Sequence, residues 1–517
     1  MGFFLFVLIL YILISISLFF VFPKVSLPAA RAIVPVVNLL DWCEFIGRKK
    51  AHAAWLLFPI VNIFIIAGMC IDLVRSFGKY QFWHSVLSVV CTPLFFIYLG
   101  LNRNEKYLGP TLVDEAKFKR KVAEARKSRN TTLLRKLENN NPYRKSSLRE
   151  WTESIIFAVF AAAFIRMFLI EMYKIPTSSM EGSLLVGDFL CVSKAHYGIR
   201  TPMTIAMIPL LHNRIPGIKK ESYWEKPSLS YYRLPALQQI RRNDPVVFNY
   251  PEGDSVFIMP GRTYSIYDIR RMGLDGNPQF THPITRPMDK MDHYIKRCIA
   301  IPGDTLEIRD KQVFINGSLA ETPKYLQYSY ILQARGTPLN ERKLKEWGIN
   351  VDDAQPPVYN LSEEHLEKIR SLENVEITPV FHPARPLFPY DPNRFNDWTV
   401  DNYGPVWVPK KGVTIDLNPD NISLYYRVIS TYEGNDLQVR NGEIILNGTP
   451  VSTYTFQMDY YWMMGDNRHN SEDSRVWGFV PENHVVGKPL FIWFSTRDGN
   501  IKNGINWNRL FTGANKK

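Results

Sequence analysis

Four long apolar runs constrain the fold of this chain more than any other feature of its sequence. Three have the roughly 20 residues that an α-helix needs to cross a bilayer, and the fourth is long enough when its flanks are included. The first run carries no charge and lacks the basic leading segment that a secretory signal needs, so we expect it to be retained as a membrane span. The runs cover residues 2–22, 53–74, 82–101 and 155–170.

Lysine and arginine are placed unevenly around these runs. The segment 102–151, between the third and fourth runs, is crowded with both residues, and the loop after the first run holds others, such as Lys24 and Arg48. Basic loops stay on the cytoplasmic side of a membrane. Four spans then place the N-terminus and everything after residue 170 on the outer side. The net charge of +13 therefore indicates basic membrane loops and a solvated linker rather than a nucleic-acid site.

From residue 172 onwards, short apolar or alternating runs are separated by Gly, Pro, Asn and Asp, which is typical of strands and turns. Helical periodicity is limited to short stretches such as 341–347 and 363–372. The stretches 306–317 and 437–448 resemble each other, and each ends in Asn-Gly, which favours two-residue hairpin turns. We interpret them as two hairpins that bracket an inserted subdomain. A chance likeness of two hairpins is the alternative, and the sequence leaves it open.

Hydroxyl residues gather directly after the fourth apolar run, in the stretch 173–184. A serine hydroxyl becomes a good nucleophile only when a neighbouring base takes its proton. The usual base is histidine, but no histidine stands in a recognisable catalytic context, and no G-x-S-x-G elbow carries these serines. A buried lysine can replace histidine, because desolvation lowers its pKa and the neutral amine accepts a proton. The histidines nearest to candidate motifs are His196, His293, His469 and His484.

Lys296 is the best lysine for this role. It lies in an apolar, strand-like run, 294–299, that leads into a Pro-Gly-Asp turn. Alternation along a strand sends Lys296 and Arg297 to opposite faces, so we expect only one of them to point at a buried site. Arginine stays protonated and cannot act as a base. Taken alone, a lysine in a strand is more often a solvated edge residue.

A third polar stretch, 465–475, is dense in turn-forming and hydrogen-bonding residues and suits a loop that orients other side chains. It lacks the spacing of an EF-hand calcium loop and contains two arginines. The chain has no CxxC pair and no Cys/His ligand spacing, which argues against a structural zinc site. Cys191 and Cys298 are either a disulfide or two buried thiols.

The three stretches together, in this order, resemble one family, the bacterial type I signal peptidases, which are membrane serine proteases with a Ser/Lys dyad. The first motif of that family, P-S-x-S-M-x-P-T-L, is similar to residues 176–184, and the second, K-R-x-x-x-x-P-G-D, to residues 296–304. The third motif, G-D-N-R-x-N-S-x-D-S-R, is intact at residues 465–475. The chain departs from the family at Thr177 (usually Ser), Gly182 (usually Pro), Ser183 (usually Thr) and His469 (often acidic), and by an additional segment, 252–293.

The resemblance implies that Ser179 is the nucleophile and Lys296 the general base. It also implies an oxyanion hole made of the Ser179 backbone N–H and the Thr177 hydroxyl, with Ser471 orienting the Lys296 amine. The same loop is expected to be held by an ion pair between Asp473 and Arg475, with support from Asp466. No cofactor and no metal are implied.

The substrates implied by the resemblance are secretory preproteins with small residues at the first and third positions before the cut. Shallow apolar pockets would measure these residues and also keep Lys296 dry. The protein would lie in the bacterial cytoplasmic membrane, in contact with the lipid bilayer, crossing it several times with its catalytic domain on the extracytoplasmic side. The expected pocket residues are Tyr173, Ile175, Met180, Leu184, Leu190, Val247, Tyr294 and Ile295.

We therefore predict a mainly β catalytic domain of antiparallel sheets, with an inserted β-rich cap subdomain and N-terminal transmembrane helices. The expected organisation is three transmembrane helices in 1–101, a basic cytoplasmic linker in 102–151, a fourth transmembrane helix in 152–171, the catalytic domain in 172–306 and 460–510, and the cap in 307–459. The alternative is a catalytically silent membrane-anchored β-domain protein that binds secreted chains. The distance between Ser179 Oγ and Lys296 Nζ discriminates between the two.

Overall fold

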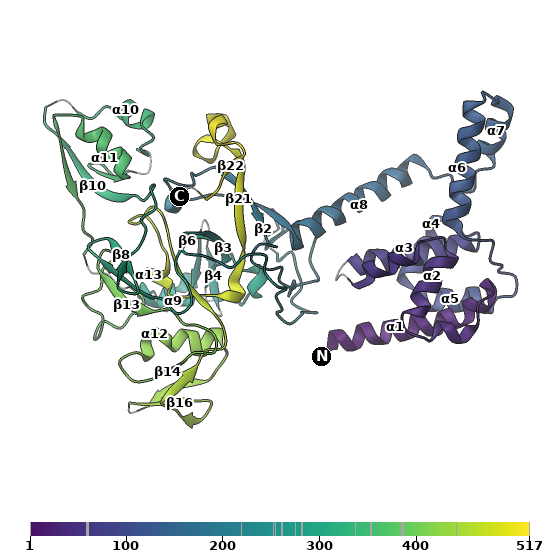
Figure 1. The fold of residues 1–517 in the computed structure, drawn as a ribbon, viewed down its shortest axis with the longest axis horizontal. Helices are drawn as coiled ribbons and strands as arrows, with labels where there is room; N and C mark the ends of the chain where they lie inside the picture. Colours follow the sequence, from purple (N-terminus) through teal and green to yellow (C-terminus); the bar gives the residue numbers. More distant parts are fainter. Residues whose placement is uncertain are drawn as a thin grey trace. The chain divides into compact units, whose positions relative to one another are not determined.

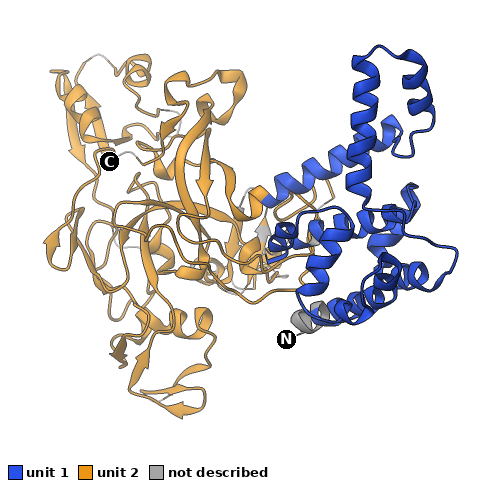
Figure 2. Ribbon diagram, turned by 45° about the vertical axis from the view of Figure 1, so that its right-hand side comes forward, with its two compact units in different colours: residues 1–164 blue, residues 165–517 orange. Residues whose placement is uncertain are grey.

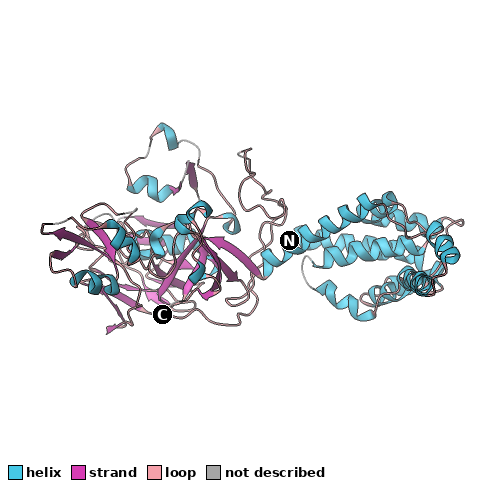
Figure 3. Cartoon of the chain, turned by 90° about the horizontal axis from the view of Figure 1, so that it is seen from above, coloured by secondary structure: helices cyan, strands magenta, loops and turns pink. Residues whose placement is uncertain are grey.

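The computed structural model divides the chain into two compact units, residues 1–164 and 165–517, shown in different colours in Figure 2. The first unit is built of helices, and the second is mainly strands and loops (Figure 3). The structure describes residues 2–57, 61–218, 220–251, 253, 255–259, 262–274, 276–280, 283–336, 338–351, 354–383, 387–440 and 442–515.

The first unit packs its helices around a core that includes Trp42, Phe96 and Leu99. The close approach of α1 and α5 depends on Gly100, because a Cβ there would lie 2.5 Å from Phe20. The helices are α1 (Gly2–Val21), α2 (Val37–Phe45), α3 (Val61–Ser76), α4 (Phe82–Val90), α5 (Thr92–Leu101), α6 (Thr111–Lys127), α7 (Thr131–Asn139) and α8 (Ser147–Phe168), labelled in part in Figure 1.

Two helical segments of the described residues are long and apolar enough to cross a membrane, Leu8–Val25 and Ser147–Phe168. The third expected run, 82–101, forms two helices, α4 and α5, with a bend of 113° between them. A proline lies in the first turn of α5. The two helices amount to a further membrane span only if the bent pair is counted as a single span. The second expected run falls partly on residues 58–60, outside the described residues. Its helix α3 has 16 residues, a length of about 24 Å, which is short for a bilayer core of about 30 Å.

The second unit is organised around one antiparallel sheet with the strand order β1-β2-β21-β3-β6-β19-β20, and β22 pairs with β21. Bulges interrupt the pairing of β21 with both β2 and β3, which increases the local twist of the sheet. Its strands are β1 (Ile170–Lys174), β2 (Asp188–Ser193), β3 (Pro245–Asn249), β6 (His293–Ala300), β19 (Tyr460–Met464), β20 (Val480–Pro481), β21 (Val485–Ser495) and β22 (Thr512–Gly513).

Both faces of this sheet are covered. Val247 and Ile295 belong to one hydrophobic cluster, together with Leu190 of β2. Val246 and Cys298 belong to another. The central strands are therefore buried on both sides, which explains why they read as continuous apolar runs rather than as alternating ones. Cys191 and Cys298 are free thiols, not a disulfide.

Smaller sheets accompany the main sheet, and the expected mainly β fold of antiparallel sheets is confirmed. The two similar stretches of the sequence are indeed hairpins, and both Asn-Gly turns have positive φ at both residues. The predicted short helices are present. The remaining elements are β4 (Val256–Met259), β5 (Arg262–Ser265), α9 (Ile266–Arg271), β7 (Thr305–Arg309), β8 (Gln312–Ile315), β9 (Ser318–Leu319), β10 (Tyr328–Ala334), α10 (Glu341–Glu346), β11 (Val358–Leu361), α11 (Glu363–Arg370), β12 (Val375–Pro379), β13 (Tyr403–Trp407), β14 (Thr414–Asp416), α12 (Ile422–Arg427), β15 (Leu437–Arg440), β16 (Glu443–Leu446), β17 (Thr449–Pro450), β18 (Thr453–Thr455) and α13 (Ser474–Trp477).

Candidate active site

Ser179 and Lys296 meet, although 117 residues separate them in the sequence: Lys296 Nζ donates a hydrogen bond to Ser179 Oγ at 2.6 Å. Ser179 lies in a short 3-10 turn, η4 (Ser178–Met180), which begins after the extended residue Thr177. Lys296 projects from β6, a strand in the interior of the main sheet. The fold thus brings a hydroxyl and an amine within hydrogen-bonding reach, which is the geometry required of a nucleophile and its base.

The Lys296 side chain is almost fully buried, with 3% of its surface exposed. Burial lowers the pKa of its amine from 10.5 to about 8, and the carboxylates of Asp473, Asp466 and Glu472 act in the opposite direction without reversing the effect. Removal from water disfavours the charged form of an amine. A useful fraction of Lys296 is therefore neutral near physiological pH and able to accept a proton.

The expectation that only one of Lys296 and Arg297 points into a buried site is wrong. Arg297 is also buried, on the other face of β6, where its guanidinium makes two hydrogen bonds of 2.7 Å to the Asp466 carboxylate. The Ser183 hydroxyl donates to the same carboxylate. Both faces of β6 are interior: Lys296 is an amine of lowered pKa on one face, and Arg297 is a guanidinium paired with Asp466 on the other. Asp466 consequently ties β6 to the loop that carries Ser179.

The third motif supports the nucleophile loop directly. The Asn467 backbone N–H donates to the Ser179 carbonyl at 3.1 Å, and its side-chain amide donates to the Ser178 carbonyl at 3.3 Å. The Asn470 amide donates to the Ser178 hydroxyl at 3.0 Å. We did not predict roles for these two asparagines, and their only signal in the sequence was their place inside the motif. Ser178 is thus engaged in loop hydrogen bonding.

Asp473 and Arg475 form the expected ion pair, with 2.7 Å between Arg475 Nη2 and Asp473 Oδ2, and Asp473 also accepts the Gly465 backbone N–H at 3.1 Å. Gly465 has to be a glycine, because a Cβ there would lie 2.3 Å from Ser471 Oγ and 2.5 Å from the Ser179 carbonyl oxygen. Ser471 Oγ is buried and has no hydrogen-bond partner of ordinary geometry among the described residues. The expected hydrogen bond from Ser471 to Lys296 is therefore not formed in this structure.

A cleft of about 1250 Å³ opens at the Ser179–Lys296 pair. Seven of the eight expected pocket residues line it, as does Thr177, whereas Leu184 is fully buried in the hydrophobic cluster behind the cleft wall. That cluster joins most of the apolar lining residues into one continuous wall. Lining residues that we did not predict are Lys174, Pro176, Val186, Met259, Thr263, Asp292, His293, Asn350, His469, Asn470, Glu472 and Asp498.

The histidines singled out in the sequence have other partners. His293 packs its ring against Tyr173 and His212, and burial lowers its pKa well below the ordinary value. His469 pairs with Asp401 at 2.7 Å and accepts the Ser329 backbone N–H at 3.1 Å. The ring of His196 forms a hydrogen bond with the Ser193 hydroxyl, and the ring of His484 forms one with the Asn483 side chain. In the part of the chain that the structure describes, no cluster of three or more His, Cys, Asp or Glu side chains could hold a metal ion.

The glycine at position 182, where the first motif of the family usually has proline, has a structural reason. Its φ is +99°, which proline cannot adopt, and a Cβ at this position would lie 2.2 Å from the Tyr325 carbonyl oxygen. The loop after Ser179 is therefore shaped to accept a segment from the inserted region.

Comparison with known proteins agrees with this geometry. The model of the family described as "Signal peptidase, peptidase S26" matches residues 148–355 and 455–494, and a "Family of unknown function (DUF5684)" matches residues 30–110. Proteins named "Signal peptidase I" are similar to the chain. The one from Buchnera aphidicola (Acyrthosiphon pisum) is 26% identical over 395 residues, covering 74% of this chain and 90% of its own length. That of Haemophilus influenzae is 26% identical, covering 69% and 74%, and that of Pseudomonas aeruginosa is 21% identical, covering 70% and 78%.

Proposed function

We propose that Ser179 and Lys296 form the catalytic dyad of this chain, which belongs to the signal peptidase family, peptidase S26. The chain is a serine endopeptidase of the type I signal peptidases, and with this dyad it removes signal peptides from preproteins. The observation that carries this assignment is the 2.6 Å hydrogen bond between Lys296 Nζ and Ser179 Oγ. The catalytically silent alternative is not favoured, since nucleophile and base are both present and in contact.

In this mechanism neutral Lys296 takes the Ser179 proton while Ser179 Oγ attacks the scissile carbonyl carbon. The resulting oxyanion accepts hydrogen bonds from the Ser179 backbone N–H and from the Thr177 hydroxyl, which lines the cleft. The Lys296 ammonium then gives its proton to the departing amine, which leaves as the N-terminus of the mature chain. A water molecule, deprotonated by Lys296, hydrolyses the ester between Ser179 and the signal peptide.

The loop residues have positioning roles in this proposal. Asp473, Arg475 and Asp466 hold the loop and β6 in place through the ion pairs described above. We assign Ser471 to orient the Lys296 amine during the reaction, since its buried hydroxyl lines the same cleft, next to Asp473, whose pKa it helps to lower. A rotation of the Ser471 side chain would be needed to make this contact.

The apolar lining of the cleft supports a proposal about the residues around the cut. We propose that the preproteins have small residues at the first and third positions before the cut, which bind against the apolar wall formed by Ile175, Leu190 and Val247. The preprotein adds as a strand to β1, which lies at one edge of the main sheet. Expected wall contacts also come from Tyr173, Met180, Tyr294 and Ile295.

We also propose that the protein lies in the bacterial cytoplasmic membrane, crosses the lipid bilayer more than once, and has the residues after 170 on the extracytoplasmic side. The basic segment 102–151 precedes the apolar helix α8, which favours a cytoplasmic start for that helix. The strand β1 follows α8 almost immediately, so the site begins close to the membrane exit.

The test is cleavage of a preprotein with alanine at both small positions by the purified full-length chain in detergent. Ser179→Ala and Lys296→Ala are expected to lower kcat by more than about 1000-fold, as for removal of a nucleophile or its base. Ser178→Ala and Lys174→Ala are matched controls, because both residues line the same cleft, and each should retain most of the activity. Full activity in Ser179→Ala or Lys296→Ala contradicts the dyad.

A further inference from the structure

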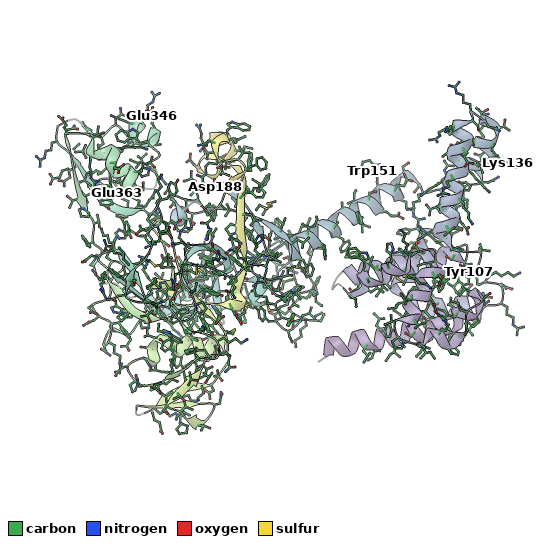
Figure 4. The ribbon with its side chains drawn as sticks, viewed as in Figure 1. Tyr107, Lys136, Trp151, Asp188, Glu346 and Glu363 are labelled. Carbon is green, nitrogen blue, oxygen red and sulfur yellow. The ribbon has the colours of Figure 1, made fainter. Side chains whose placement is uncertain are left out.

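A small lobe of the inserted region, which we call the α10–α11 lobe and define as residues 326–380, lies at the cleft. It consists of the sheet β11-β10-β12 with α10 and α11, and it has a hydrophobic core of its own that includes Leu344, Leu361 and Ile369. Figure 1 shows these elements together, and Figure 4 labels Glu346 and Glu363 on their helices. A lobe with its own core is able to hold a cleft-lining residue in a fixed position.

The lobe and the residue before it contact the loop that follows Ser179. The Tyr325 carbonyl packs onto Gly182 so closely that a side chain there is excluded. The Asn350 side-chain amide donates a hydrogen bond to the Glu181 carboxylate at 3.2 Å, and Asn350 lines the cleft. These contacts come two and three residues after the nucleophile.

A second set of contacts joins the lobe to the third motif. The Gln327 backbone N–H donates to the Asp466 carbonyl at 2.9 Å, and the Arg468 N–H donates to the Gln327 carbonyl at 2.9 Å. The Ser329 N–H donates to the ring of His469, another residue of the cleft. The start of the lobe is thereby attached to the same loop that supports Ser179. The position of Asn350 relative to the dyad is fixed from both sides.

The cleft has one continuous apolar wall, although Lys174, Asp292, His293 and Asp498 are polar lining residues outside the lobe and the third motif. The apolar residues before Ser179 in the chain, together with those of β2, β3 and β6, form one hydrophobic cluster. Asn350, His469, Asn470 and Glu472 are polar lining residues of the lobe and the third motif, and two of them hydrogen-bond the loop of Ser179: Asn350 to Glu181 and Asn470 to Ser178. If the signal-peptide side of the substrate occupies the apolar wall, the chain beyond the scissile bond leaves along the polar wall.

We propose that the α10–α11 lobe binds the mature side of the preprotein, and that Asn350 hydrogen-bonds the polypeptide backbone there, within the first few residues after the cut. This inference rests on the proposed function. A primary amide carries both donors and an acceptor, so it pairs with a peptide group whatever the neighbouring side chains are. The lobe therefore adds affinity for an extended polypeptide without selecting its sequence.

The experiment compares two internally quenched peptides with the same residues before the cut. The short one ends at the second mature residue, and the long one continues for six more. The full-length protein in detergent is expected to have a higher kcat/KM for the long peptide. Asn350→Ala should lose about 3- to 10-fold of kcat/KM on the long peptide, as for one neutral hydrogen bond, through KM, and should leave the short peptide unchanged. Asn374→Ala, at an exposed position of the same lobe, is the matched control and should behave like the wild type.

The outcomes separate the two proposals. A wild type that cuts neither peptide removes the proposed function itself. Equal kcat/KM for the two peptides in the wild type, or an Asn350→Ala variant that keeps the full advantage of the long peptide, overturns the inference about the lobe while signal-peptide cleavage stands. An equal loss on both peptides also overturns it, because it shows that Asn350 only maintains the structure.

Discussion

The pKa of Lys296 leads to a quantitative expectation for the pH dependence of cleavage. With a pKa of about 8, roughly a tenth of the amine is neutral at pH 7. An unperturbed lysine of pKa about 10.4 would be neutral in only about 1 molecule in 2500 at that pH. Burial thus increases the population of the active base about 250-fold, and this factor enters kcat/KM directly while the base is mostly protonated.

The assay is kcat/KM for a quenched peptide without ionisable side chains, measured from pH 5.5 to 10. We expect a rise of about tenfold from pH 6 to pH 7 and a plateau above pH 9, since the titrating group has a pKa of about 8. The buried rings of His293 and His469 cannot produce this limb, because burial lowers the pKa of both below the ordinary value of 6.5. A continued tenfold rise between pH 9 and pH 10 would refute the argument, and so would a limb near pH 6.

Three further predictions concern stability. Lys296→Met should be inactive but more stable at pH 7 by about 3 kcal/mol, because the folded-state pKa of the amine lies below its unfolded value and the charged amine destabilises the fold. In thermal melts this gain should be full below pH 8 and should vanish as the pH rises past 10.5. Gly182→Ala should lower the free energy of unfolding more than Gly448→Ala does, because both glycines have positive φ but only Gly182 faces a backbone atom. The control variant Gly448→Ala should lower it by about 1–2 kcal/mol, and an equal loss in both variants would contradict the steric argument. Asp466→Asn should destabilise by about 3–5 kcal/mol, since it leaves the Arg297 charge buried without its carboxylate, and an unchanged denaturant midpoint would contradict this.

Much of the site was predictable because its motifs are local. Residues 465–475 signal a loop by composition, and the Asn-Gly pairs signal hairpin turns by backbone preference. The assignment of buried faces failed for Arg297, because alternation predicts one solvated face, and a strand in the interior of a sheet covered on both sides has none. Hydropathy alone does not register the 113° bend between α4 and α5 in the third apolar run, because it measures composition and not backbone direction.

The sequence by itself determined which groups are available for the proposed chemistry: a serine, a lysine and a polar loop in a fixed order, behind apolar runs of membrane length. Tertiary structure alone decided which groups meet. The lysine has a lowered pKa only because the fold buries it beside Ser179, and desolvation depends on neighbours far apart in the chain. The approach of Tyr325 to Gly182 and of Asn350 to Glu181 left no pattern in the sequence, because a packing contact between distant segments has no period.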